Sequence, residues 1–89
     1  MAWTIEYARS VQTQLRKIDP QIRSRLRSYM ETRIAPLDNP RQIGKALQGS
    51  QLGNLWRYRI SDYRIICQLQ DQRLVVLVVG MGHRKEVYR

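Results

Sequence analysis

Apolar and polar residues alternate most clearly between positions 55 and 69 of the 89-residue chain. Residues 55–60 (LWRYRI) and 63–69 (YRIICQL) both show a period of two, which is typical of β-strands with one buried face. A short turn signal, Ser61-Asp62, lies between them, so we expect a hairpin with Ile60 opposite Tyr63. That register pairs Arg59 with Arg64 and Arg57 with Ile66. The other, core-like face carries Trp56, Tyr58, Ile60, Tyr63, Ile65 and Cys67.

The pattern predicts one strand and two helices before the hairpin. Residues 3–7 alternate as a strand, and residues 8–17 have apolar side chains at helical spacing. Asp19-Pro20 marks the start of a second helix, which runs to about Ile34. After the hairpin, residues 74–79 (LVVLVV) are apolar throughout, as expected of a central strand. The N-terminal strand is the candidate for its second neighbour.

These elements predict one α+β domain over residues 1–89, in the order β-α-α-β-β-β. Two N-terminal helices pack on one face of a small, mostly antiparallel four-stranded sheet, and the arginine face stays open. Residues 37–54 are the least regular part of the chain. There, Lys45–Gly49 is either a helical turn that brings Lys45 near the arginines or a loop that leaves it in solvent.

Charge adds a partner class to this picture. The chain has 16 Lys and Arg residues against 7 Asp and Glu, a formal charge of +9, which favours a nucleic acid or an acidic protein as partner. No membrane partner is expected, since no segment is long and apolar enough to span a bilayer. The N-terminus, MAWTIEY, lacks a signal-peptide pattern, so we expect a cytoplasmic protein. The lone Cys67 is expected to be a buried, inert thiol.

Arginines are clustered on the open sheet face at a cost, because like charges directly opposite each other destabilise a sheet. A bound polyanion would explain the cluster, and the alternative is a solvated basic face. The second helix offers another basic surface, which either holds nucleic acid or simply faces water. Its members are Arg23, Arg25, Arg27 and Arg33.

The C-terminal segment holds the candidates for proton transfer. Gly80-Met81-Gly82 is expected to loosen the end of the central strand and place His83 near Arg64. Cleavage of RNA by its own 2′-hydroxyl needs a base, an acid and cations around the phosphorane. The imidazole of histidine can serve as the acid or the base, because it exchanges protons near neutral pH. The competing interpretation is a plain surface histidine. Tyr88 is either a core anchor or a platform for base stacking. We expect no metal and no small-molecule cofactor.

The chain resembles the RelE/ParE toxin superfamily of bacterial toxin–antitoxin systems over essentially its whole length. The resemblance rests on WRYRISDYRII at 56–66, LVVLVVGMGHR at 74–84 and HRKEVY at 83–88, with KALQG at 45–49 a weaker fourth piece. It implies the helix-on-sheet fold derived above. It also implies one of two activities, because the RelE branch cleaves mRNA in the ribosomal decoding site whereas the ParE branch poisons DNA gyrase without cutting RNA.

The resemblance to the RelE branch implies roles for individual residues. Arg57 and Arg59 match basic residues that bind phosphate and stabilise the transition state, and Arg64 matches an arginine at the scissile phosphate. Tyr88 matches a tail tyrosine that orients the nucleotide beside the cut. Lys45 matches a basic position that we expect only to bind RNA. Further RNA-binding candidates in the tail are Arg84 and Lys85.

His83 corresponds to a variant of the family pattern. The type member has an arginine acting as acid where this chain has Gly82, and other ribosome-dependent members carry a catalytic histidine close to the C-terminus. The resemblance therefore implies that His83 is the acid or base, in a catalytic set with Arg59, Arg64 and Tyr88.

The sequence thus favours an endoribonuclease that acts on mRNA in the ribosome, with mRNA and rRNA as nucleic-acid partners. The alternatives are a non-catalytic gyrase inhibitor and a plain RNA-binding module. All three imply an acidic, RelB-like antitoxin that folds on binding and covers or distorts the arginine face.

Overall fold

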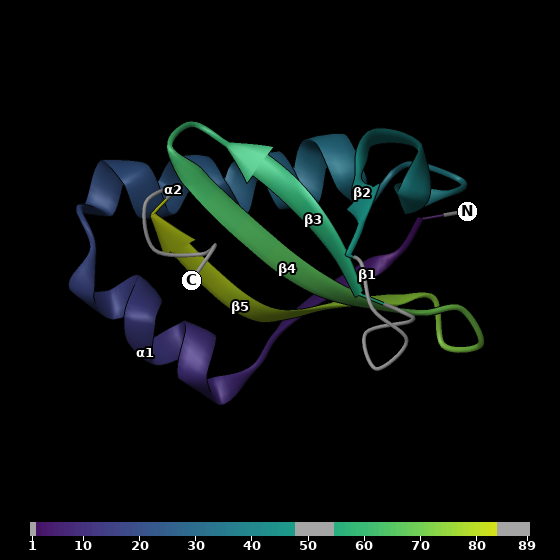
Figure 1. Ribbon diagram of the computed structural model, residues 1–89, viewed down its shortest axis with the longest axis horizontal. Helices are drawn as coiled ribbons and strands as arrows, with labels where there is room; N and C mark the ends of the chain where they lie inside the picture. The colour runs from purple at the N-terminus through teal and green to yellow at the C-terminus, as the bar shows by residue number, and fades with distance from the viewer. Residues whose placement is uncertain (1, 48–54, 84–89) are drawn as a thin grey trace.

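The computed structural model describes residues 2–47 and 55–83, in which two helices cover one face of a mixed sheet (Figure 1). The strand order is β1-β5-β4-β3-β2, with β1 parallel to β5 and the other neighbours antiparallel. Within the described ranges, no helix is long and apolar enough to cross a membrane. The elements are β1 Thr4–Tyr7, α1 Arg9–Lys17, α2 Pro20–Tyr29, the π-helical turn η1 Met30–Ile34, the 3₁₀ turn η2 Pro40–Ile43, β2 Lys45–Ala46, β3 Leu55–Ile60, β4 Tyr63–Gln70 and β5 Val75–His83.

The α+β class and the packing of helices on one sheet face are confirmed, but the sheet has five strands rather than four. The additional strand is β2, in which Lys45 pairs with Arg57 and Ala46 with Trp56. Of the two conformations that the sequence left open at Lys45, the helical turn does not form, and positions 48 and 49 lie outside the described residues. A strand of two residues is too short to show alternation, so the pattern of the sequence did not reveal it.

Both helices bury the apolar stripes that the sequence predicted. The second helix begins as expected: Pro20 is its first residue, and the Asp19 carboxylate accepts a hydrogen bond of 2.7 Å from the Gln21 amide. It continues through η1 to Ile34, the predicted end. The cluster of buried residues between helices and sheet comprises Trp3, Ile5, Val11, Leu15, Leu26, Met30, Ile34, Ala35, Tyr58, Ile60, Ile65, Cys67, Leu69, Val76 and Val78.

The central strand β5 contains a break in register. Ile66 of β4 is paired with Gly80, whereas the next residue, Cys67, is paired with Val78. Val79 is therefore an extra residue, and the irregularity is a β-bulge. The strand was predicted to end here, yet it continues for another four residues. Because side chains alternate along a strand, one extra residue turns every later side chain to the face opposite the one that simple counting gives.

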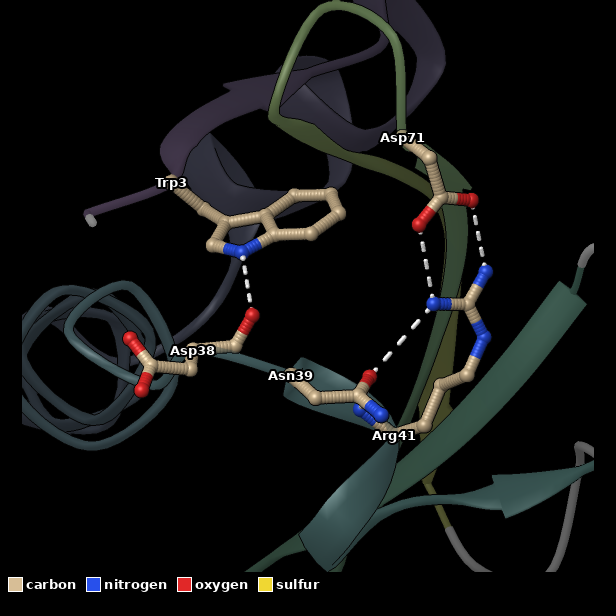
Figure 2. Close-up of polar contacts among 5 residues, drawn as sticks. All are labelled: Trp3, Asp38, Asn39, Arg41 and Asp71. Atoms are coloured by element: carbon tan, nitrogen blue, oxygen red, sulfur yellow. Dashed lines mark hydrogen bonds and ion pairs between the residues drawn. The ribbon is translucent and has the colours of Figure 1, made fainter.

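Side chains from three parts of the chain hold the segment between η1 and β2 in place (Figure 2). The indole nitrogen of Trp3 donates a hydrogen bond of 3.2 Å to the backbone carbonyl of Asp38. The Arg41 guanidinium donates to both carboxylate oxygens of Asp71, at 3.0 and 2.7 Å, and to the Asn39 side-chain oxygen at 3.4 Å. Asp71 lies in the turn between β4 and β5, so this ion pair ties η2 to the sheet.

Close packing on Tyr58 fixes the same segment from the other side. The buried Tyr58 hydroxyl donates a hydrogen bond of 2.9 Å to the carbonyl of Pro40. A Cβ atom at Gly44 would lie 2.8 Å from Cε1 of the Tyr58 ring, which leaves no space for a larger residue. These contacts set where the chain enters β2, and so where Lys45 lies.

Candidate nucleic-acid interface

Four cations lie together on the sheet face that the helices leave uncovered. Arg59 of β3 is paired directly with Arg64 of β4, as predicted, and Arg57 is paired with Lys45 of β2. Cross-strand partners project from the same side of a sheet. We call the surface formed by Lys45, Arg57, Arg59 and Arg64 the basic face. The structure thus places Lys45 beside the arginines, one of the two positions that the sequence left open.

An apolar side chain lies next to three of these cations. Ile43, at the end of η2, is 44% exposed, and with Lys45, Arg57 and Arg59 it lines a hollow of about 140 Å³. Ile43 was not among the residues predicted from the sequence, because a single apolar residue in an irregular loop gives no periodic signal. A hollow with one apolar wall and cations around it suits a ligand that has both a flat apolar surface and a phosphate.

His83 does not lie on the basic face. It is paired with Tyr63 of β4, and the two rings meet edge to face with centroids 5.8 Å apart and an interplanar angle of 81°. Tyr63 packs against the core from the helix side. The expectation that His83 converges with the arginines on one face is therefore wrong in this conformation. The physical reason is the bulge at Val79: if Val79 were paired with Ile66 in a regular ladder, His83 would project from the opposite side.

Two glycines occupy the places on β5 that the bulge turns toward the basic face. Gly82 is paired with Arg64, and Gly80 is paired with Ile66, whose other neighbour is Arg57. The side of β5 that adjoins the arginines is thus bare backbone.

Comparison with known proteins decides the family. The family model described as "ParE toxin of type II toxin-antitoxin system, parDE" matches residues 5–88. The chain belongs to the ParE toxin family. It is the toxin component of a type II toxin–antitoxin system, within the RelE/ParE superfamily that the sequence resembles.

Relatives of this ParE-family toxin have RelE-type names. "Toxin RelG" of Mycobacterium tuberculosis is 26% identical over 90 residues, which cover 100% of this chain and 99% of the relative. "mRNA interferase toxin RelE" of Escherichia coli is 28% identical over 90 residues, which cover 99% of this chain and 92% of the relative. Among solved structures, the Mycobacterium tuberculosis complex RelBE2 superposes with a TM-score of 0.82 at 20% identity, covering 97% of this chain and 95% of that one. Isolated Escherichia coli RelE superposes with a TM-score of 0.72 at 23% identity, covering 98% of this chain and 92% of that one.

The arginines of α2 and η1 in this toxin make contacts within the protein. Arg23 donates to the carbonyl of Leu15 at 3.2 Å, and Arg25 donates to the Ser61 hydroxyl at 3.2 Å. The guanidinium groups of the other two stack on tyrosine rings, with 5.1 Å from Arg27 to the Tyr7 centroid and 5.6 Å from Arg33 to the Tyr29 centroid. These contacts give the arginines of α2 and η1 a structural role, so the open sheet face is the stronger candidate for nucleic acid.

The remaining predicted site residues of the toxin, Arg84, Lys85 and Tyr88, lie outside the described residues. Among the described residues, no three His, Cys, Asp or Glu side chains come together as a set of metal ligands. Cys67 is fully buried, and burial raises the pKa of its thiol, so it is held in the unreactive protonated form.

Proposed function

We propose that this toxin is an endoribonuclease that cleaves mRNA in the decoding site of the ribosome and so stops translation. The observation that supports the proposal is the direct pairing of Arg59 with Arg64 on an open sheet face. Two like charges held side by side reduce stability, and a bound phosphate would offset that cost. Guanidinium groups suit this task, because they bind phosphate oxygens in pairs.

The proposed reaction is attack of a ribose 2′-oxygen on the adjacent phosphorus. The bond from the 2′-oxygen to phosphorus forms as the bond from phosphorus to the 5′-oxygen breaks, which leaves a cyclic phosphate and a free 5′-hydroxyl. Arg59 and Arg64 stabilise the extra negative charge on the phosphorane. Arg57 and Lys45 hold the phosphates of neighbouring nucleotides. One group accepts the 2′-hydroxyl proton, and another donates a proton to the departing oxygen.

We assign proton transfer to His83 and orientation of the nucleotide to Tyr88. The assignment of His83 has a structural requirement: the ring must leave its contact with Tyr63 and turn around the end of β5 toward Arg64. His83 is the last residue of β5, where a strand end constrains a side chain less than its interior does. Arg84 and Lys85, which follow directly, would extend the cations along the RNA.

We further infer that the toxin binds an acidic, RelB-like antitoxin that covers the basic face, and that its docking site on the ribosome is rRNA. The charge of +9 supports both partners. Several solved structures that share the fold are toxin–antitoxin complexes, among them RelBE2 of Mycobacterium tuberculosis.

A second candidate function is inhibition of DNA gyrase without catalysis. Two observations favour it: the matching family model is described as ParE, and the one histidine projects away from the arginine pair. In this alternative, the basic face binds a protein or DNA surface and needs no proton donor.

Primer extension on a defined mRNA, naked and in stalled ribosomes, separates the two functions. The nuclease proposal expects cuts only on the ribosome, and expects Arg64→Ala and His83→Ala to abolish them. Arg73→Ala is the matched control, because Arg73 lies in the turn between β4 and β5, where it pairs with Glu6 at 3.7 Å, and its loss removes the same charge. Cuts that survive His83→Ala would remove His83 from the mechanism. Absence of cuts together with loss of gyrase supercoiling would establish the second candidate.

A further inference from the structure

Gly80 has no role that the fold requires. Its φ lies outside the left-handed region, so its backbone suits any residue. A Cβ atom at this position would lie 3.7 Å from Cβ and 3.9 Å from Cγ1 of Ile66, which is ordinary van der Waals contact. Gly44 differs, because a Cβ atom there would collide with the Tyr58 ring at 2.8 Å. Alanine therefore fits at position 80 but not at position 44.

Glycine inside a strand is unfavourable unless something needs the space above the backbone. It loses more conformational freedom on folding than other residues and leaves no side chain to pack. Strand glycines that the fold does not require often mark a close approach by a ligand or another backbone. The bulge at Val79 strengthens this reading, since it turns Gly80 to the basic face.

The surroundings of Gly80 suit a flat ligand that carries a phosphate. Gly80 and Gly82 are two residues apart, so together they leave a strip of bare backbone about 7 Å long, close to the width of a nucleobase. Ile66 provides an apolar wall beside Gly80, and Arg64 is the direct partner of Gly82. The strip therefore lies next to the cations proposed to hold the scissile phosphate.

We propose that Gly80 and Gly82 form the floor of a nucleobase subsite on the basic face. In this subsite, which rests on the proposed function, one unstacked base of a single-stranded RNA lies flat on the β5 backbone and against Ile66. The phosphate next to that base reaches Arg59 and Arg64. Base faces are sequence-tolerant binding elements, so the subsite positions the nucleotide without selecting one base.

The test measures how much a base contributes to binding in the wild type and in Gly80→Val. The probe is a fluorescein-labelled, 2′-O-methylated tetraribonucleotide, which cannot be cleaved, compared with the same chain made abasic at each position in turn. Fluorescence anisotropy gives the dissociation constant of each. Gly80→Ala is the second variant. Gln68→Val is the control, because it places a β-branched side chain on the same sheet face beside Leu55 and Leu77, two same-face pairs away from Arg59 and Arg64.

In the wild type, removal of one particular base should weaken binding about tenfold, which is the scale of one stacked base. The Gly80→Val protein should bind the intact and abasic probes equally. The preference for the intact probe should be intermediate in Gly80→Ala and equal to that of the wild type in Gln68→Val. Thermal unfolding should show both glycine variants folded, and Gly80→Ala at least as stable as the wild type, because alanine restricts the unfolded chain and its Cβ atom fits the strand.

Two results would overturn the subsite. One is a Gly80→Val protein that keeps the wild-type preference for the intact probe. The other is an equal loss of affinity for intact and abasic probes, which would show that the variant disturbs phosphate binding and not a base. A different result would overturn the proposed function itself. In that result, the wild-type protein binds the two probes no more tightly than the Arg64→Ala protein does, and it cuts no mRNA on ribosomes.

Discussion

Arg59 and Arg64 are direct cross-strand partners, one pair away from the turn of the β3–β4 hairpin. Since Arg59 is exposed, the replacement Arg59→Gln should relieve repulsion and raise the free energy of unfolding by about 0.2–1 kcal/mol at low salt. Urea unfolding at two salt concentrations checks this, and the gain should shrink as salt screens the charges.

Although Arg59→Gln should be more stable than the wild type, it should be less active. If Arg59 stabilises the phosphorane, Arg59→Gln should reduce ribosome-dependent cleavage by about 100-fold. Arg73→Gln serves as the control, with unchanged cleavage expected. A stabilised Arg59→Gln protein with full activity would show that Arg59 is no part of the reaction.

Tyr58 is predicted to be the anchor of the segment that leads into β2. The variant Tyr58→Phe keeps the ring but leaves the Pro40 carbonyl without its buried donor. We expect it to lower the free energy of unfolding by about 1–3 kcal/mol, the cost of an unsatisfied buried acceptor. Urea unfolding measures the loss. A change close to zero would mean that water replaces the hydroxyl.

The Arg41–Asp71 ion pair should make a small contribution that depends on pH. A double-mutant cycle with Arg41→Ala and Asp71→Ala should give a coupling of about 0.5–1 kcal/mol, since both groups are partly exposed. The hydrogen bond from Arg41 lowers the pKa of Asp71 below its ordinary value of 3.8. The coupling is therefore fully present above pH 3.8 and should fade as the pH falls further. A coupling that persists in strong acid would contradict this origin.

Tyr7 should reduce stability in alkaline solution. Burial, followed by the nearby Glu31 carboxylate, raises the pKa of Tyr7 from 10.0 to about 12. Between these values the unfolded chain releases the proton while the folded chain keeps it, so stability falls as pH rises from 10.0 toward about 12. Denaturant unfolding across this range should show a shallower decline in Tyr7→Phe.

Near pH 7, Tyr7→Phe should lower the free energy of unfolding only slightly. The Tyr7 hydroxyl is buried and has no hydrogen-bond partner among the described residues, so its removal leaves no group unsatisfied. Loss of more than about 1 kcal/mol in Tyr7→Phe at neutral pH would reveal a partner for this hydroxyl.

Local pattern was sufficient to predict the hairpin and the apolar first part of the central strand. Alternation and a two-residue turn determine that Arg59 faces Arg64, because both depend on residues close in sequence. The start of α2 at Asp19 and Pro20 was equally local. Strand β2 escaped prediction because its two residues are held by pairing with β3 and by contacts on Tyr58, which are distant in sequence.

The candidate site was predictable only up to Val79. A bulge is a relation between two strands, and nothing in the run LVVLVVGMGH marks which residue lacks a partner. The strand was expected to end at Val79, with His83 near Arg64 beyond it, but it continues past the bulge and His83 projects from the other face. The arginines, whose hairpin pairs regularly, were assigned correctly.

The bulge also lets β5 lose one residue without a change in which side chains meet. Val78 and Gly80 already pair with the adjacent residues Cys67 and Ile66, so deletion of Val79 would close the ladder and keep His83 opposite Tyr63. Pairing of Val79 with Ile66 in a regular ladder would have the opposite result: Met81 and His83 would move to the side of Arg64, and the glycines would move to the side of the helices. One unpaired residue thus decides whether bare backbone or an imidazole lies beside the arginines.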